Sequence, residues 1–136
     1  MKSLLLSILL LGSTLPGLAM VAYEPEQCTG TQAQYEALAQ VYRDTIKRET
    51  DILISITDKV SADAAVEQLK KCHSEYMRLQ SYMWLNPPAP EIYTWFQQHL
   101  SELCLELISQ QDAEIERIKK ADYFGSEALK QLSETR

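Results

Sequence analysis

The chain has 136 residues, of which 24% are charged and 46% hydrophobic, and its formal net charge is −6 at pH 7. A chain of this length is expected to form one domain. An acidic chain without a basic cluster is a poor match for nucleic acid, because nucleic-acid binding depends on the neutralisation of phosphates. The same charge argues against an anionic lipid surface. We therefore expect neither nucleic acid nor a membrane surface as a partner.

The first 19 residues have the layout of a secretory signal peptide. A basic start at Lys2 precedes an apolar run over residues 4–11, and small residues stand at Gly17 and Ala19. Because the run is shorter than the roughly 20 residues that span a bilayer, we expect no membrane anchor. We predict cleavage after Ala19, with cleavage after Ala22 as the alternative, and therefore a periplasmic or secreted protein. Cleavage after Ala19 removes one of 13 basic residues and none of 19 acidic ones, which leaves a net charge of −7.

The rest of the chain has the 3.6-residue period of amphipathic helices. After an extended lead-in over residues 20–30, we predict long helices over about residues 31–57, 62–85 and 91–121, and a short helix over about 127–132. Their apolar stripes are Tyr35, Leu38, Tyr42, Ile46, Leu53 and Ile56; Ala65, Leu69, Cys72, Tyr76, Leu79 and Met83; and Phe96, Leu100, Leu103, Cys104, Leu107, Gln111, Ile115 and Ile118. The short connections predict an all-α fold, namely an up-down-up antiparallel three-helix bundle with a short fourth C-terminal helix, in one domain over residues 31–136.

The first connection is the stretch TDKVSADAAV at residues 57–66. Ser61 is the predicted N-cap of the second helix, because its hydroxyl can accept a hydrogen bond from the first helical turn. Val60 and Ala65 have the spacing of a hydrophobic staple across that cap. The stretch is therefore interpreted as a corner between two helices.

The three cysteines, Cys28, Cys72 and Cys104, suggest one disulfide and one remaining thiol in an exported chain. In an antiparallel helical hairpin, two residues lie at the same height when their sequence midpoint falls in the turn. The midpoint of Cys72 and Cys104 is Pro88, whereas Cys28 should lie roughly 20 Å away, beyond disulfide reach. We predict a Cys72–Cys104 disulfide, with two reduced core cysteines as the alternative. Cys28 is the candidate for an intermolecular thiol.

The second connection contains three prolines within residues 87–90, which end the preceding helix. Six large apolar side chains stand beside it: Tyr82, Trp84, Leu85, Ile92, Tyr93 and Trp95. Adjacent helical positions cannot all face inward, so some of these side chains should form an exposed partner patch. The alternative is that they close one end of the core. Both interpretations stay open.

The two histidines, His73 and His99, are the candidates for metal binding. Their midpoint also falls in the proline-rich turn, which would bring them near one level. The Glu-x-x-His pattern that di-iron bundles carry on two helices is absent, and no strand-to-helix turn presents a serine nucleophile. We therefore expect no metal, no cofactor and no enzymatic activity.

Two stretches, Asp58-Lys-Val-Ser-Ala-Asp-Ala-Ala65 and Tyr123-Phe-Gly-Ser-Glu-Ala-Leu129, resemble a group of small exported helical proteins of Gram-negative bacteria of the Verrucomicrobia type. That group has a D-x-x-S-A-x-x-A-A-like corner and a Y-(Y/F)-G-S-x-x-L tail. The resemblance implies an exported helical bundle and transfers no functional residues.

The sequence thus favours a small exported, non-enzymatic helical bundle that acts through a protein partner or as a homodimer. The alternative is a periplasmic metal or small-ligand carrier that uses His73 and His99 between its helices.

Overall fold

The structure, a computed structural model, describes residues 28–135 of the chain. Its elements are α3 (Gln32–Ser55), α4 (Lys59–Leu85), α5 (Pro90–Lys120), the 3-10 helix η2 (Asp122–Gly125) and α6 (Glu127–Glu134). In this part of the chain, β pairing is limited to one isolated bridge between Gly30 and Pro88. The predicted all-α class is confirmed. The predicted signal peptide and the lead-in before Cys28 lie outside the described residues.

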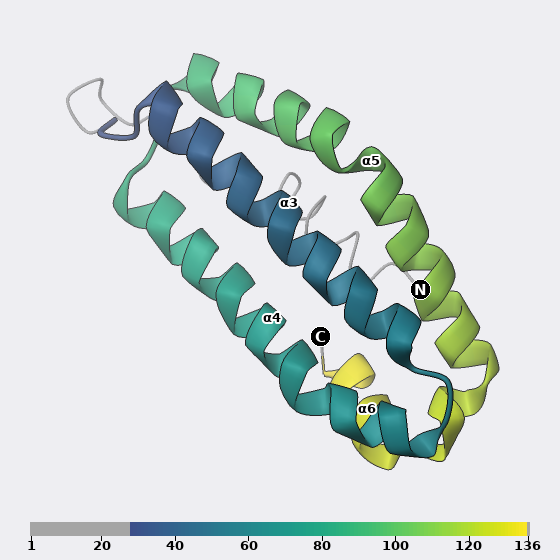
Figure 1. The fold of residues 1–136 in the computed structure, drawn as a ribbon. Coiled ribbons are helices and arrows are strands. Elements are labelled where there is room, and N and C mark those ends of the chain that lie inside the picture. Colours follow the sequence, from purple (N-terminus) through teal and green to yellow (C-terminus); the bar gives the residue numbers. More distant parts are fainter. Residues whose placement is uncertain (1–27, 136) are drawn as a thin grey trace.

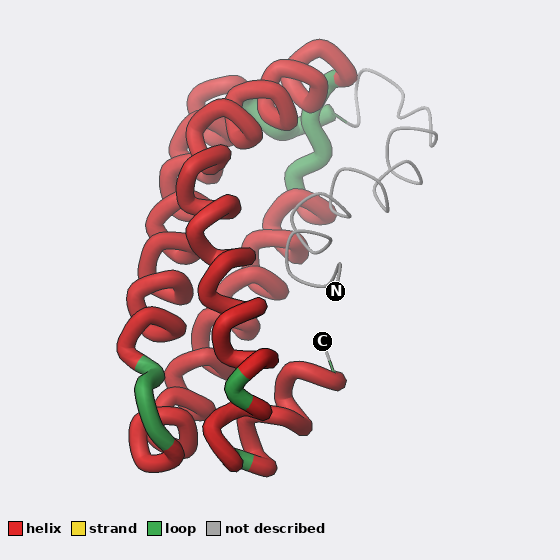
Figure 2. Tube along the Cα trace, turned by 90° about the vertical axis from the view of Figure 1, so that its right-hand side faces the viewer, coloured by secondary structure: helices red, strands yellow, loops and turns green. Residues whose placement is uncertain are grey.

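Helix α3 is the element around which the other long helices are arranged. Figure 1 shows α3 between α4 and α5, and its backbone comes close to both of them. Figure 2 shows the long helices running side by side, with the described loops at their two ends. The short α6 packs on α4, and η2 contacts both α4 and α5. One end of the molecule therefore holds the proline-rich turn, and the other holds the α3–α4 corner with the C-terminal segment.

The buried apolar side chains form two clusters along α3. The cluster toward the proline-rich turn contains Tyr35, Leu38, Ala39, Tyr42, Ile46, Tyr76, Leu79, Met83, Phe96, Leu100, Cys104 and Ile108. The cluster at the corner contains Leu53, Ile56, Ala62, Ala65, Val66, Leu69, Ile118 and Leu129. The predicted stripes of the first two long helices are buried throughout, and Leu103, Leu107 and Ile115 of the third are half-buried.

A buried polar pair lies between these two clusters. Glu49 and Gln111 are both 0% exposed, and Gln111 Nε2 donates a hydrogen bond to Glu49 Oε2 at 3.2 Å. Along α3, Glu49 falls between Ile46 of one cluster and Leu53 of the other. Buried polar groups need hydrogen-bond partners, since an unpaired one costs about 1–3 kcal/mol. The pair therefore favours one height of α5 against α3.

The N-terminal cap of α4 differs from the prediction. The cap is Asp58, whose carboxylate accepts from the Ser61 N–H at 2.8 Å, while Ser61 Oγ accepts from the Asp58 N–H at 3.0 Å. This reciprocal arrangement is a capping box. Ser61 is the third residue of α4, so the prediction of Ser61 as the N-cap was wrong. The staple was also wrong, because Val60 is 78% exposed.

Arg117 of α5 closes the C-terminal end of α3. Its Nη1 donates to the Ile56 carbonyl at 2.9 Å, and its Nη2 donates to the Leu53 carbonyl at 3.0 Å. Glu114 accepts from Arg117 Nε at 2.7 Å, and the guanidinium lies 5.7 Å from the centroid of the Phe124 ring. The last carbonyls of a helix lack intrahelical donors. Arg117 supplies donors to this helix end from another helix.

The segment after α5 turns through a run of left-handed backbone. The φ angles of Asp122, Tyr123 and Phe124 are 46°, 54° and 54°, and that of Gly125 is 75°. Such angles are uncommon for residues other than glycine. The turn reverses the chain and sets α6 against α4.

Ser126 joins this segment to the α3–α4 corner. Its Oγ accepts from the Leu129 N–H at 3.1 Å as the N-cap of α6, and donates to Asp63 Oδ1 at 2.6 Å. Lys59 Nζ donates to the other oxygen of the same carboxylate at 2.6 Å. The corner and tail stretches, distant in sequence, therefore contact each other through Asp63 and Ser126.

Replacing Arg117 by methionine should destabilise the fold by about 2 kcal/mol, because the Leu53 and Ile56 carbonyls lose charged donors. Urea unfolding followed by circular dichroism would measure the change. The matched control is Arg78→Met, which removes an exposed ion pair with Glu75 and should cost less than about 1 kcal/mol. Equal losses in the two variants would contradict the role of Arg117 as a helix cap.

Asp63 should make stability depend on acidic pH. The hydrogen bond from Lys59, and then that from Ser126, hold the pKa of Asp63 below its ordinary value of 3.8. The stability that Asp63 contributes is therefore present above about pH 4 and is lost as the pH falls through the folded-state pKa. Urea midpoints measured from about pH 5 to about pH 2.5 should decline less steeply in Asp63→Asn than in the wild type.

Asp58 should account for part of the decline that remains in that variant, because the Ser61 N–H also lowers its pKa. The control is Asp51→Asn, which removes an exposed carboxylate paired with Lys47 on α3 and touches no loop. A decline in Asp63→Asn as steep as that of the wild type would show that Asp63 contributes nothing.

Candidate functional site

The end of the molecule with the proline-rich turn is fixed by the lead-in to α3. Gly30 N–H donates to the Pro87 carbonyl at 3.0 Å, and Tyr35 Oη donates to the Asn86 carbonyl at 2.9 Å. A Cβ atom on Gly30 would lie 2.5 Å from the Asn86 carbonyl oxygen, so glycine is required for this close approach. Half-buried Cys28 lies two residues before Gly30, which places it near the turn as predicted. An intermolecular bond through Cys28 stays a prediction.

The six residues of the predicted partner patch divide into two groups. Tyr82, Ile92, Tyr93 and Trp95 are half-buried and pack against the first core cluster. Trp84 and Leu85 are 59% and 78% exposed. Four of the six therefore close the end of the core, and two adjacent large side chains face outward.

Helix geometry explains why Trp84 and Leu85 are exposed. The buried stripe of α4 ends at Met83, which is 4% exposed. Each following residue is rotated by about 100° around the helix axis, so the next two side chains turn away from the core. The helix then stops at Asn86, whose N–H and Nδ2 both donate to the Tyr82 carbonyl at 3.0 Å. The two exposed side chains therefore stand on the last turn of α4, beside the turn.

The predicted Cys72–Cys104 disulfide was wrong. Both residues are buried, at 1% and 0% exposure, but no disulfide joins cysteines within residues 28–135, and the cysteines are not close. The prediction considered only height along the bundle, whereas α3 lies between α4 and α5 (Figure 1). Burial raises the pKa of the Cys104 thiol to about 11, although the Arg43 charge lowers it. This thiol is therefore protonated at neutral pH and a poor nucleophile.

The two histidines occupy different environments. His73 is exposed on α4, whereas His99 is half-buried on α5 with its ring stacked on Trp95 at 4.8 Å between centroids. His99 Nε2 is buried and has no hydrogen-bond partner among the described residues. Across residues 28–135, no three histidine, cysteine, aspartate or glutamate side chains gather as metal ligands.

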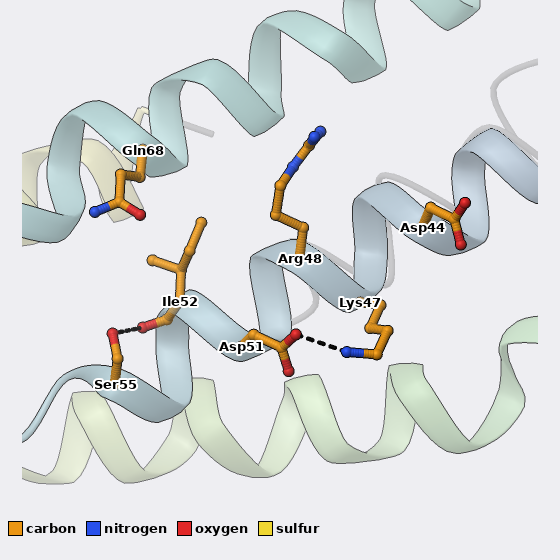
Figure 3. Close-up of a pocket in the computed structure, with 7 residues that line it drawn as sticks. All are labelled: Asp44, Lys47, Arg48, Asp51, Ile52, Ser55 and Gln68. Carbon is orange, nitrogen blue, oxygen red and sulfur yellow. Dashed lines mark hydrogen bonds and ion pairs between the residues drawn. The ribbon is translucent and has the colours of Figure 1, made fainter.

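An open groove of about 490 Å³ lies between α3 and α4 (Figure 3). Its lining residues are Asp44, Lys47, Arg48, Asp51, Ile52, Ser55 and Gln68. Lys47 Nζ lies 2.8 Å from Asp51 Oδ2, and Ser55 Oγ donates to the Ile52 carbonyl at 2.6 Å. No pattern in the sequence predicted this groove. Its charged residues on α3 have the spacing of a solvent-exposed helix face. The residue spacing within one helix does not show whether a groove separates that helix from its neighbour.

Comparisons of the chain with protein-family models, curated protein sequences and solved structures gave no match. Of the helices between residues 28 and 135, none combines the length and the apolar character needed to cross a bilayer.

Proposed function

We propose that this chain is an exported, non-enzymatic helical protein that acts by contact with another protein surface. Its three long helices are proposed to form an up-down-up antiparallel bundle. The protein that it contacts is proposed to be a second copy of the chain. The proposal of export depends on the signal-peptide layout of residues 1–19 and agrees with the resemblance of the corner and tail motifs to exported bundles.

The exposure of Trp84 and Leu85 carries the proposal of a protein contact. The part of a large apolar side chain that remains in water contributes no burial energy, and a partner that covered it would add up to about 1.5–3 kcal/mol for each side chain. Tryptophan is among the residues most enriched at the centres of protein interfaces. The half-buried rings of Tyr82, Tyr93 and Trp95 pack against the first core cluster, which extends toward the same end of the molecule.

A second copy is the simplest occupant of this surface. A two-fold interface places the same patch on both subunits, so one exposed pair of side chains meets another without a separate partner surface. The chain is acidic overall, yet Asn86, Pro87, Pro88 and Ala89 give the turn beside the patch no charged side chain. The turn itself therefore adds no repulsion between like charges when two copies meet, and exposed Glu91 in the first turn of α5 is the acidic side chain that follows it.

Sedimentation velocity over a series of protein concentrations tests self-association. The wild type should form dimers, and Trp84→Ser/Leu85→Ser should raise the dimer Kd at least about tenfold because interface anchors of this kind cost about 2 kcal/mol or more when removed. The matched control is Val60→Ser. Val60 has the same 78% exposure as Leu85 but stands at the start of α4, and its loss should leave the dimer unchanged.

A wild type that stays monomeric at every concentration would contradict the proposal of self-association. Equal weakening by the control and the double variant would contradict the assignment of the contact to the proline-rich end.

A further inference from the structure

We propose that the groove between α3 and α4 binds the C-terminal carboxylate of an extended peptide whose last residue is apolar. Its volume of about 490 Å³ falls within the usual range of small-ligand sites. Gln68, its contribution from α4, stands 16 residues before Trp84, or about 24 Å along the helix at 1.5 Å per residue. The inference therefore goes beyond the contact proposed above and can fail or succeed independently of it.

The charges of the groove leave one cation without a partner. Lys47 pairs with Asp51 at 2.8 Å, and Asp44 lies 3.6 Å from Arg43. The Arg48 side chain makes no hydrogen bond or ion pair within residues 28–135. In Figure 3 its side chain rises from α3 toward α4, away from the Lys47–Asp51 pair.

A single carboxylate fits this charge pattern better than a phosphate does. The guanidinium fork of arginine matches a carboxylate through two parallel hydrogen bonds. Asp44 and Asp51 line the same groove and would repel a dianion more strongly than a monoanion. We therefore assign Arg48 to the terminal carboxylate of the peptide.

Ile52 supplies an apolar surface next to Arg48. The two residues are four positions apart on α3, so their side chains lie on the same face of the helix. Ile52 is half-buried and packs against the second core cluster, which holds it in place. The apolar side chain of the last peptide residue would lie against Ile52 while the carboxylate meets Arg48.

The other end of the groove can bind a peptide backbone. The Ser55 hydroxyl donates its proton to the Ile52 carbonyl at 2.6 Å, so its oxygen remains as an acceptor. The Gln68 side chain makes no hydrogen bond within the described residues, and its amide can both donate and accept. The seven positions from Arg48 to Ser55 span about 10 Å of helix, close to the length of three extended residues at about 3.3 Å each.

The direct test is an NMR titration of the ¹⁵N-labelled chain with N-acetyl-Ala-Ala-Leu. The proposal predicts saturable shifts of the backbone amides of Arg48, Ile52 and Gln68, with a Kd of about 1 mM for so open a site. The same peptide with a C-terminal carboxamide should bind at least about tenfold more weakly, because it lacks the charge that Arg48 meets.

Two variants separate the proposed contacts. Arg48→Gln should weaken binding at least about tenfold through loss of the charged hydrogen bonds, and Gln68→Ala should weaken it about threefold through loss of a neutral one. Arg78→Gln is the matched control, because Arg78 is an exposed arginine of α4 that pairs with Glu75 at 2.6 Å outside the groove. Thermal melting of each variant should match the wild type, which separates a loss of binding from a loss of fold.

The proposal would be overturned by shifts that do not saturate or that fall outside the groove, by equal binding of the carboxylate and carboxamide peptides, or by binding to Arg48→Gln with the wild-type affinity. Free leucine that binds as tightly as the peptide would also contradict it, since a single amino acid does not reach both ends of the groove.

Discussion

The structure depends on the burial of one helix between two others. α3 presents apolar side chains toward both α4 and α5, and neither of those helices could cover it alone. Tyr35 and Tyr42 illustrate this constraint. The Phe96 ring of α5 lies edge-on to Tyr35 at 5.1 Å, and the Tyr76 ring of α4 stacks on Tyr42 at 6.2 Å. Burial also raises the pKa of both tyrosines, so they stay neutral in the folded protein.

Both ends of α3 are held by side chains or backbone from other parts of the chain. At its start, the Gly30 N–H and the Tyr35 hydroxyl donate to carbonyls of the proline-rich turn. At its end, Arg117 donates to the carbonyls of Leu53 in α3 and of the C-cap residue Ile56, and Ser126 links the C-terminal segment to Asp63. Glu49 and Gln111 add a polar contact in the middle of the helix. The three regions together fix the position of α3 along its whole length.

The periodicity of apolar residues predicted the helices because each stripe faces a core. It placed the helix ends within a few residues, but Ser61 was wrongly predicted as the cap of α4 in place of Asp58. Asp58 and Ser61 form a reciprocal pair, and the side chains of both can cap a helix. Which of the two is the N-cap depends on the residue at which the backbone becomes helical. The burial of Glu49 could have been predicted, since this residue falls on the apolar stripe between Ile46 and Leu53.

Other features depend on long-range geometry that a sequence pattern does not contain. The midpoint rule predicted one height for Cys72 and Cys104, and it contained nothing about the position of α3 between their helices. The left-handed run from Asp122 to Phe124 has no glycine to signal it, and only Gly125 at its end is a residue that favours such angles. The exposure of Trp84 and Leu85 follows from the end of the α4 stripe at Met83. The sequence pattern alone could therefore have predicted which two of the six side chains are exposed.

Native-state hydrogen exchange tests most directly whether α3 is the central helix. Amides that are released only by global unfolding exchange most slowly, and they mark the best-covered elements of a structure. The slowest amides of the chain should lie in the middle of α3, between Leu38 and Leu53, because α4 and α5 cover this helix from two sides. Faster exchange in this part of α3 than in the middle of α4 or α5 would contradict the account.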